Sequence, residues 1–326
     1  MGIGIVAVGG YVPPGTVDNE KISEWTGTDP AWVESRTGIS ERHYAPEEMS
    51  TSEMAVAAAA PLLEDTRLRA RIALLVTATS TPDQPQPATA VLVQQQLDLP
   101  ILPAFDVNAV CSGFLYAMAT AQALMAQRAS GDCALVVGAD KYSTIMDRSD
   151  RKTVSLFGDG AGAVVLGHVP DGYGIHGVAL LADGQSTSLV RVEAGGTRKP
   201  LTPERMENGD HLFRMDGRAV REWGLQFVPK AVNEALEQAG LTVSDMDRVV
   251  LHQGNTRLVE ALGQALGVPE DKLALTAPDY GNTAAASIPL TLFSEHSRRP
   301  FSRGERILLA SVGGGMTAGA IVLTWY

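Results

Sequence analysis

The chain has 326 residues, of which 45% are hydrophobic and 19% charged, and it contains 33 glycines. This length allows one large domain or two fused half-size units, and the composition is typical of a compact, turn-rich protein and excludes disorder as the main state. Lys and Arg number 26 against 37 Asp and Glu, a net charge of −11. Nucleic-acid binding is not expected, because it depends on basic side chains that neutralise phosphates.

The N-terminal stretch MGIGIVAVGG is apolar, but no basic residue precedes it and no small-residue cleavage site follows a long apolar run. It therefore predicts a first strand and not a signal peptide. No apolar run reaches the roughly 18 to 20 residues that span a bilayer, so no membrane segment is expected. The two cysteines, Cys111 and Cys133, suggest neither a disulfide framework nor a zinc site and favour a cytoplasmic location.

Segments of the first half of the chain recur in the same order in the second half, which indicates a duplication with halves at 1–168 and 169–326. In both halves short apolar β-rich runs alternate with helical patterns, as in layered α/β folds whose sheets are covered on both faces. The repeated strand-like segments are Ile72–Thr77 with Val249–Gln253, Ala134–Gly138 with Ile307–Ser311, and Ala161–Leu166 with Ala318–Leu323.

Two segments stand out from this pattern. A helix predicted over Ser112–Arg128 is apolar around most of its circumference, which predicts burial between two sheets. The stretch Asp183–Met215 is polar, contains Gly and Pro, and lacks clean periodicity. It is expected to run over the surface near the junction of the halves, either as a cover for a binding site or as a plain connector.

Cys111 lies where the predicted buried helix begins. A thiol at a helix N-terminus is near the positive end of the helix dipole, so its thiolate should be favoured and the cysteine is a candidate nucleophile. The alternative is a buried structural thiol, which is the expectation for Cys133. The counterpart of Cys111 in the second half is the region of Asn282, and His252 ends a predicted strand, so Cys, His and Asn could converge on one crevice. Taken alone, His252 is more often expected to be a hydrogen-bonded core histidine than a catalyst.

Two glycine-rich stretches, Phe157–Gly167 and Val312–Leu323, precede β-runs. Neither fits the dinucleotide fingerprint or contains the lysine of a phosphate-binding loop, but the N–H groups of such turns could form an oxyanion hole. No pair of histidines has metal-ligand spacing, so neither a metal nor a cofactor is expected.

These residues together resemble β-ketoacyl-acyl carrier protein synthase III, a type III condensing enzyme of the thiolase superfamily. The stretches that carry the resemblance span nearly the whole chain: WVESRTGISERH (Trp32–His43), FDVNAVCSGF (Phe105–Phe114), FGDGAGAVVL (Phe157–Leu166), HQGNTR (His252–Arg257), YGNTAAASIP (Tyr280–Pro289) and GGGMTAG (Gly313–Gly319).

The resemblance implies a five-layered αβαβα thiolase fold and a homodimer, with a catalytic triad at Cys111, His252 and Asn282. Cys111 would attack an acyl-CoA thioester, with an oxyanion hole formed by the N–H groups of Cys111 and Gly314. His252 and Asn282 would then donate hydrogen bonds to a malonyl thioester, so that the enolate left by CO₂ loss is stabilised. A largely neutral His252 with a defined tautomer is expected, because it must donate.

The resemblance also assigns substrate-binding residues. The coenzyme A site would be formed by Thr28, Trp32, Arg36, Arg151 and Asn255, although Trp32 taken alone would be expected in the core. Acyl carrier protein is strongly acidic, so a chain of net charge −11 would bind it through a local basic rim that includes Arg257.

Two departures from the family pattern bear on the acyl group. Gln86 stands at the gate of the acyl pocket, where a bulky apolar residue contributed across the dimer is usual, and Val312 replaces an aromatic residue. They suggest a non-standard starter that is branched, bulky or polar. Arg148 would suit a carboxylated acyl group if it faces inward.

The expected function is therefore decarboxylative condensation of an acyl starter with malonyl-acyl carrier protein, in fatty-acid, polyketide or other secondary metabolism. The closest alternative is a thiolase-fold acyltransferase that passes the acyl group to an alcohol or amine without losing CO₂. A non-catalytic partner subunit and a cysteine hydrolase are further alternatives; the presence of Cys111 argues against the first and its NAVCSG context against the second.

Overall fold

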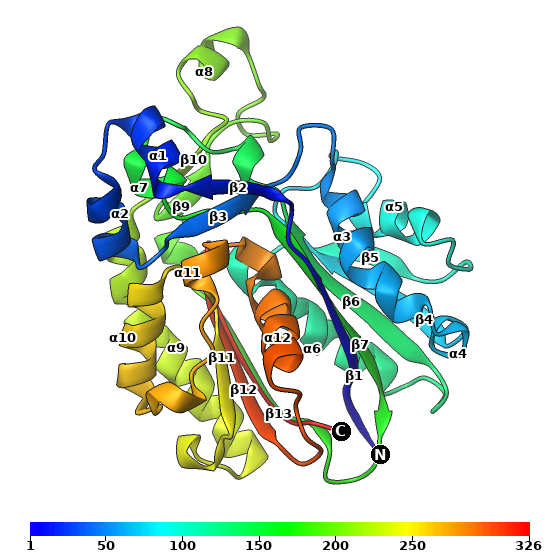
Figure 1. Ribbon diagram of the computed structural model, residues 1–326. Coiled ribbons are helices and arrows are strands. Elements are labelled where there is room, and N and C mark those ends of the chain that lie inside the picture. The colour runs from blue at the N-terminus through cyan, green and yellow to red at the C-terminus, as the bar shows by residue number, and fades with distance from the viewer.

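The computed structural model, which describes residues 1–326, contains two mixed β-sheets (Figure 1). In the first sheet, β4 runs parallel to β5 and β6 while β7 is antiparallel to its neighbours. The strands of the first sheet, in spatial order, are β1 (Gly2–Tyr11), β7 (Gly160–Val169), β6 (Cys133–Asp140), β4 (Ile72–Ala78) and β5 (Ala104–Val107). Those of the second are β8 (Gly174–Ala182), β13 (Thr317–Thr324), β12 (Arg306–Gly313) and β11 (Arg248–Leu251).

The second sheet repeats the pairing of the first. Strands β11 and β12 are parallel, and β13 is antiparallel to both β12 and β8. An isolated parallel bridge between Val249 and Leu273 occupies the place that β5 holds in the first sheet. Strand β7 ends at Val169 and β8 begins at Gly174, so the division predicted between residues 168 and 169 falls at the end of β7.

Helices cover both sheets and separate them, which gives five layers (Figure 1). The central layer is α6 (Gly113–Met125) and α12 (Ser287–Arg298), and α6 packs against strands of both sheets. Its Phe114, Leu115 and Met118 are fully buried, which confirms the helix predicted between the sheets. The outer layers are α3 (Thr51–Ala59) and α5 (Thr89–Gln96), with short α4 (Thr66–Arg69), on the first sheet, and α9 (Gly217–Ala239) and α10 (Thr256–Leu266) on the second.

Glycines let the two halves approach closely. Gly138 and Gly162 face each other across β6 and β7. A Cβ at Gly162 would lie 2.4 Å from the backbone nitrogen of Leu290 in α12, and one at Gly138 would lie 2.4 Å from the carbonyl oxygen of Ala285. Only glycine leaves room for this contact. The turn before α12 therefore rests directly on the first sheet.

The remaining elements gather at one end of the sheets (Figure 1). Helix α2 begins with Pro30 at its first position and Asp29 as its N-cap, a favourable start. No helix combines the length and apolar character needed to cross a membrane. These elements are β2 (Gly15–Asp18), α1 (Asn19–Thr26), α2 (Pro30–Thr37), β3 (Glu41–Tyr44), α7 (Arg151–Val154), β9 (Val190–Val192), α8 (Pro203–Glu207), β10 (Phe213–Met215) and α11 (Ala277–Tyr280).

Candidate active site

A pocket of about 820 Å³ opens at this end, where the halves meet. Cys111, His252 and Asn282 all line it, although they come from three separate turns. Each of the three side chains is at least nine-tenths buried. The structure thus brings the three predicted catalytic residues together on the floor of one pocket.

Cys111 lies in a single 3₁₀ turn between β5 and α6. The residue before it, Val110, has a φ of 48°, a strained backbone conformation for a β-branched residue. The hydroxyl of Ser311 donates to the carbonyl of Cys111 at 3.0 Å and so ties the turn to the second half. Strain held in this way is typical of functional sites.

The protonation state predicted for Cys111 was wrong. Burial, followed by the nearby Asp140 carboxylate, raises the pKa of the Cys111 thiol, and its own backbone N–H lowers it by less. Desolvation disfavours the thiolate more than the backbone N–H of Cys111 favours it. The resting nucleophile is a thiol, so acyl transfer needs a base. Cys133 is fully buried in β6, as expected of a structural residue.

His252 follows β11, and its backbone N–H donates to the carbonyl of Ala310 at 2.8 Å. Burial lowers the pKa of the imidazole to about 4, so the ring is neutral at physiological pH, as predicted. Its Nδ1 is buried without a hydrogen-bond partner, so no hydrogen bond fixes the predicted tautomer. A neutral imidazole can accept the proton of a thiol and can later donate a hydrogen bond.

Asn282 is held on both sides by its backbone. Its N–H donates to the carbonyl of Leu156 at 2.8 Å, and its carbonyl accepts from the N–H of Gly158 at 3.0 Å. The side-chain Oδ1 accepts from the N–H of Ala284 at 2.9 Å. Because this contact occupies the oxygen, the NH₂ group of Asn282 is the part that can donate to a ligand.

The predicted oxyanion donor Gly314 lines the same pocket as Cys111, and so does Val312. Gly314 is buried, yet its N–H donates to no group of the chain. A Cβ at this position would lie 2.9 Å from Cγ1 of Val190. A buried unpaired N–H is costly unless a ligand uses it, which is what an oxyanion donor requires.

Aromatic rings form the apolar wall beside Cys111. Tyr142 stacks on Phe157 with ring centroids 4.5 Å apart, and Phe213 packs edge-on against Phe157 at 4.9 Å. Phe157 and Phe213 line the pocket, whereas Tyr142 lies behind them and hydrogen-bonds to Ser80 Oγ at 3.1 Å. The motif search missed Tyr142 and Phe213; the FGDGAG stretch that begins with Phe157 was the one available signal.

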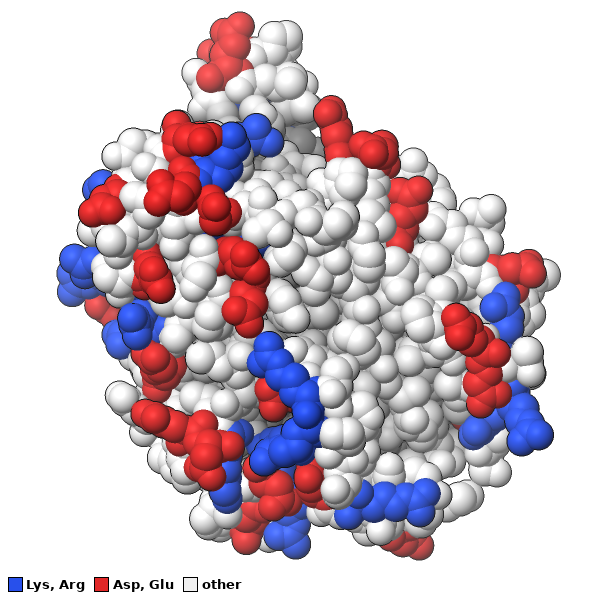
Figure 2. All heavy atoms as spheres, in the orientation of Figure 1, with Lys and Arg blue, Asp and Glu red and all other residues white.

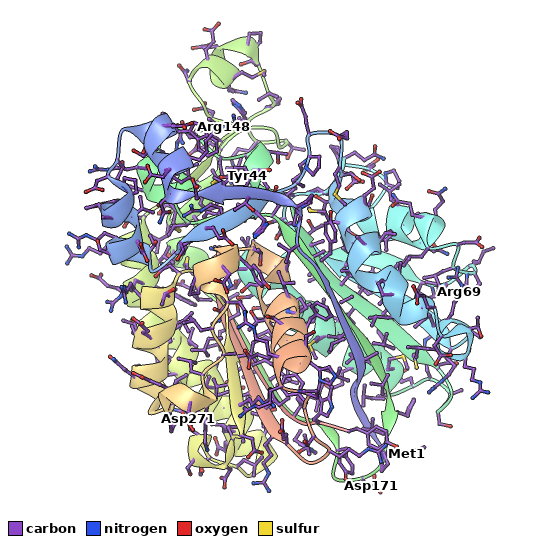
Figure 3. The ribbon with its side chains drawn as sticks, viewed as in Figure 1. Met1, Tyr44, Arg69, Arg148, Asp171 and Asp271 are labelled. Atoms are coloured by element: carbon purple, nitrogen blue, oxygen red, sulfur yellow. The ribbon has the colours of Figure 1, made fainter.

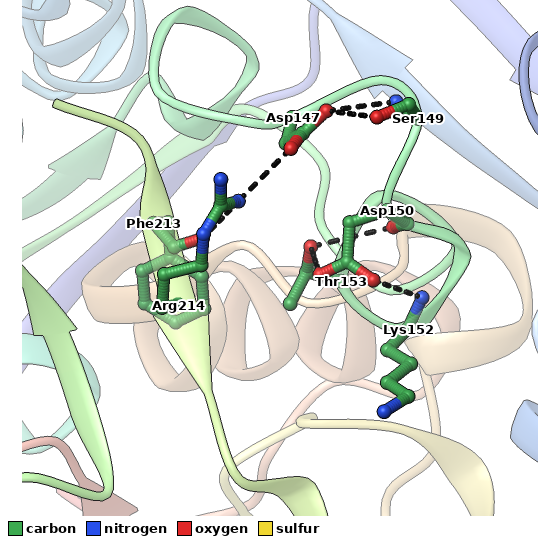
Figure 4. A network of polar contacts seen from close by, with 7 residues as sticks. All are labelled: Asp147, Ser149, Asp150, Lys152, Thr153, Phe213 and Arg214. Carbon is green, nitrogen blue, oxygen red and sulfur yellow. Dashed lines mark hydrogen bonds and ion pairs between the residues drawn. The ribbon is translucent and has the colours of Figure 1, made fainter. Parts of the chain in front are cut away.

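The polar stretch 183–215 covers the site and is not a plain connector. It contributes Val190, Phe213 and Met215 to the pocket lining. Strand β10 is fastened to the segment before α7: the N–H of Phe213 donates to the carbonyl of Ile145 at 2.8 Å, and Arg214 forms an ion pair with Asp147 at 3.1 Å (Figure 4). An apolar cluster within an otherwise polar stretch was the sequence signal for this role.

Cationic side chains surround the mouth of the pocket. Trp32, Arg36, Arg151 and Asn255 line it, as predicted for a coenzyme A site. The guanidinium of Arg151 lies 5.0 Å from the centroid of the Trp32 ring and that of Arg36 lies 6.0 Å away, on a half-buried ring that is not in the core. Asn255 also caps α10 by accepting from the N–H of Leu258. Sequence analysis missed three further cations in the lining: Lys152, Arg218 and Arg221.

Four residues singled out from the sequence lie elsewhere. Thr28 is buried outside the lining, and Gln86 is exposed on the segment that leads into α5. Arg257 is exposed and pairs with Glu260. Arg148 is exposed and lies near Tyr44 (Figure 3), with its guanidinium 4.9 Å from the centroid of the Trp25 ring, so the condition for binding a carboxylated acyl group, that it faces inward, is not met.

Comparison with known proteins agrees with this geometry. Two family models match: "3-Oxoacyl-[acyl-carrier-protein (ACP)] synthase III" over residues 105–184, and the C-terminal model of the same family over 236–325. The chain is 40% identical to acetoacetyl CoA synthase NphT7 of Streptomyces sp. (strain CL190), covering 98% of each chain. It is also 40% identical to β-ketoacyl-[acyl-carrier-protein] synthase III of Geobacillus kaustophilus (strain HTA426), covering 100% of this chain and 99% of the relative.

Solved structures give the same result. A 3-oxoacyl-(acyl carrier protein) synthase III from Pseudomonas aeruginosa PAO1 superposes with a TM-score of 0.90 at 33% identity, covering 100% of this chain and 98% of the other. The priming β-ketosynthase of the R1128 polyketide pathway superposes with a TM-score of 0.91 at 31% identity, covering 99% and 96%. The chain belongs to the 3-oxoacyl-[acyl-carrier-protein] synthase III family of thiolase-fold condensing enzymes and is an acyltransferase.

Proposed function

We propose that the protein loads an acyl group from acyl-CoA onto Cys111 and condenses it with a malonyl thioester, with loss of CO₂. The observation that carries this proposal is the convergence of Cys111, His252 and Asn282 on one buried pocket floor. In the first half-reaction the sulfur attacks the thioester carbonyl while neutral His252 takes the thiol proton; the carbon–sulfur bond to coenzyme A then breaks, and His252 returns this proton to the departing coenzyme A thiolate and is neutral again. The N–H groups of Cys111 and Gly314 hold the oxyanion.

In the second half-reaction His252 and Asn282 donate hydrogen bonds to the carbonyl oxygen of the malonyl thioester. The carbon–carbon bond to the carboxylate breaks, CO₂ leaves, and its electron pair forms an enolate whose charge these donors stabilise. The enolate carbon then attacks the acyl carbonyl on Cys111, and the carbon–sulfur bond breaks to release a 3-oxoacyl product. The departing thiolate takes up a proton again.

The starter group is proposed to be compact and apolar. Tyr142, Phe157 and Phe213 close the space beside Cys111 with rings and without charge. A carboxylated starter gains no support, since Arg148 lies outside the pocket. Of the non-standard starters predicted from the sequence, a branched one is compatible with these apolar walls, and it remains a prediction.

The predicted homodimer is also a proposal. Strand β5 ends the first sheet with an unpaired edge, which is a template for pairing with a second strand. Large apolar side chains close to it in the chain are exposed: Ile101 fully and Val91 by 39%. Gln86 lies on the segment leading to α5, which packs on β5, so pairing through this edge would place Gln86 near the partner subunit. Light scattering on the purified protein tests the assembly.

The proposed malonyl donor is malonyl-acyl carrier protein, with Arg257 on its docking surface. A second candidate, malonyl-CoA, is favoured by the charges at the rim. Arg257 pairs with Glu260 at 3.1 Å and Arg218 with Glu222 at 2.9 Å, whereas Arg36 and Arg151 have no carboxylate within ion-pair distance. Over α1, α2 and α10 basic and acidic side chains alternate (Figure 2), and the relative NphT7 is named for a CoA product.

One assay tests these assignments. Purified protein is incubated with acetyl-, isobutyryl-, hexanoyl- or succinyl-CoA, together with malonyl-CoA or malonyl-acyl carrier protein, and CO₂ release and 3-oxoacyl product are measured. Condensation with either malonyl thioester supports the proposed function. The ratio of the rates with malonyl-CoA and malonyl-acyl carrier protein shows which of the two the protein prefers. A parallel incubation replaces the malonyl thioester by an alcohol or amine acceptor; acyl transfer there, without CO₂ release in the malonyl incubations, would overturn the proposal in favour of the alternative acyltransferase.

A further inference from the structure

The duplicated fold contains two copies of one turn. In the first half, Oδ1 of Asn108 accepts a hydrogen bond from the N–H of Val110 at 3.2 Å, just as Oδ1 of Asn282 accepts from Ala284 at 2.9 Å. Val110 and Ala284 both have positive φ, 48° and 49°. A 3₁₀ turn and then a central helix follow in each case.

This correspondence identifies the residue of the second half that is equivalent to Cys111, and the residue that faces it. The residue after Val110 is Cys111, and the residue after Ala284 is Ala285. The strands that face these turns correspond as well: Asp140 ends β6 and Gly313 ends β12, at matching places in the pairing with β7 and β13. Asp140 therefore stands opposite Ala285 as Gly313 stands opposite Cys111.

The two copies differ at this facing residue. Gly313 packs against the backbone of the Cys111 turn and leaves no room for a side chain, because a Cβ there would lie 2.7 Å from the nitrogen of Ser112; Cys111 and Gly313 both line the pocket. In the other copy Asp140 fills the space, and its Oδ2 accepts from the N–H of Ala285 at 2.9 Å. One turn therefore opens onto the pocket, while the other is held by a carboxylate.

Asp140 is fully buried and receives a further five hydrogen bonds at its other oxygen. The neighbouring Lys141 does not neutralise it, because its ammonium donates to three backbone carbonyls of the segment 46–49. Burial raises the pKa of the Asp140 carboxyl, and the hydrogen bonds that it accepts from Ala285, Ser80, Thr81 and Thr79 oppose this shift and stabilise the carboxylate. The donors to Oδ1 are the N–H groups of Ser80 and Thr81 and the hydroxyls of Thr79, Ser80 and Thr81, at 2.8 to 3.1 Å.

We propose that Asp140 is a positioning residue for decarboxylation: by holding the N–H of Ala285 it fixes the turn that presents the side-chain amide of Asn282 to the malonyl group. This inference rests on the proposed condensing function. The path is short, since Ala285 adjoins Ala284, whose N–H holds Oδ1 of Asn282. Losing the Asp140 contact would free this turn, and a small misplacement of a catalytic group is costly.

The same carboxylate acts on the nucleophile in the opposite sense. Burial is the largest cause of the raised pKa of the Cys111 thiol, and the negative charge of Asp140 is the second largest. Neutralising it should make the thiolate easier to form and lower that pKa. Asp140→Asn should therefore spare or speed acylation while it slows decarboxylation, a split that a purely structural role would not produce.

The test uses the full-length protein and measures the half-reactions separately. Acylation is followed by intact mass after mixing with acyl-CoA, decarboxylation by CO₂ release from a malonyl thioester, and thiol ionisation by the pH dependence of iodoacetamide alkylation. For Asp140→Asn we expect decarboxylation to fall by about tenfold to a hundredfold, with acylation unchanged or faster and alkylation shifted to lower pH. The matched control is Asp159→Asn, because Asp159 is equally buried and its carboxylate accepts three hydrogen bonds, but these come from Ala45 and Ser143 and not from the Ala285 turn.

If Asp140→Asn does not fold, replacing Ala285 by its α-hydroxy acid removes the N–H that donates to Asp140 and leaves every side chain in place. Decarboxylation should again fall with acylation spared. An equal loss of both half-reactions, or unchanged decarboxylation in either variant, would overturn the inference. If the wild-type protein itself releases no CO₂, the proposed function fails; if it does and the split is absent, only the role of Asp140 fails.

Discussion

The floor and the mouth of the pocket are built on opposite principles. On the floor, Cys111, His252 and Asn282 are buried, and the thiol and imidazole are both uncharged at neutral pH. At the mouth, Arg36 and Arg151 are exposed, charged and free of carboxylates. The difference indicates that chemistry relies on desolvated hydrogen-bond donors, whereas binding relies on charge in contact with water.

The largest expected effect concerns the floor. His252→Ala and Asn282→Ala should each reduce decarboxylative condensation by on the order of 10² to 10³, because a donor to the enolate oxygen is lost. Asn282→Ala should still become acylated at Cys111, whereas His252→Ala should also be acylated more slowly because the thiol loses its base; intact mass spectrometry measures acylation of both variants. His176→Ala, on a histidine that hydrogen-bonds Thr324 outside the pocket, is the control. Equal loss of both half-reactions in Asn282→Ala would contradict this division of roles.

At the mouth the expected effect is smaller and appears in KM. If Arg151 binds a phosphate of coenzyme A, as the family resemblance implies, Arg151→Ala should raise KM for acyl-CoA about tenfold, roughly 1.4 kcal/mol, with kcat nearly unchanged. The difference from wild type should shrink with salt. Acyl-pantetheine, which lacks phosphates and adenine, is the control: if Arg151→Ala weakens it equally, the arginine does not recognise the nucleotide part.

The aromatic wall beside Cys111, between the floor and the mouth, is expected to limit the size of the acyl group. Tyr142→Leu should raise the ratio of kcat/KM for hexanoyl-CoA over acetyl-CoA by roughly threefold to tenfold, since a smaller side chain behind Phe157 lets the wall yield. Competition between the two thioesters measures the ratio. Tyr173→Leu, a residue that packs on Tyr326 away from the pocket, serves as the control. An unchanged ratio would assign acyl selection to other residues.

The smallest expected effect is a flat pH response. Because burial lowers the pKa of His252 to about 4, the ring holds no proton charge above that value and gains one only as pH falls through it. Decarboxylation by the acylated enzyme should vary little from pH 8 to about 5 and decline below that. A histidine with an unperturbed pKa would instead cause a decline near pH 6.5. A midpoint near 6.5 would show that His252 is more hydrated than its burial indicates.

Much of the fold and the site could be predicted from the sequence, because duplication leaves a repeated order of apolar segments. Helix α6, the strand pairs and the convergence of Cys111, His252 and Asn282 follow from that order together with the family motifs. Trp32, Arg36 and Arg151 line the pocket for the same reason.

The rest depends on distances across the fold that no local pattern encodes. The pKa of Cys111 is set by burial and by Asp140, which is 29 positions away in the sequence. Tyr142 and Phe213 meet because β10 returns to the segment before α7. Gln86 lies outside the pocket of its own chain, and a partner subunit, which the sequence does not position, would decide its role.

The central claim is that Cys111 is the acyl carrier on the pocket floor. Incubation with acyl-CoA followed by proteolysis and peptide mass spectrometry tests it, with Cys133 as the internal comparison. We expect the acyl group on the peptide that contains Cys111, none on the Cys133 peptide, and its loss on adding a malonyl thioester. An acyl group elsewhere, or one on Cys111 that the malonyl thioester does not remove, would contradict the account.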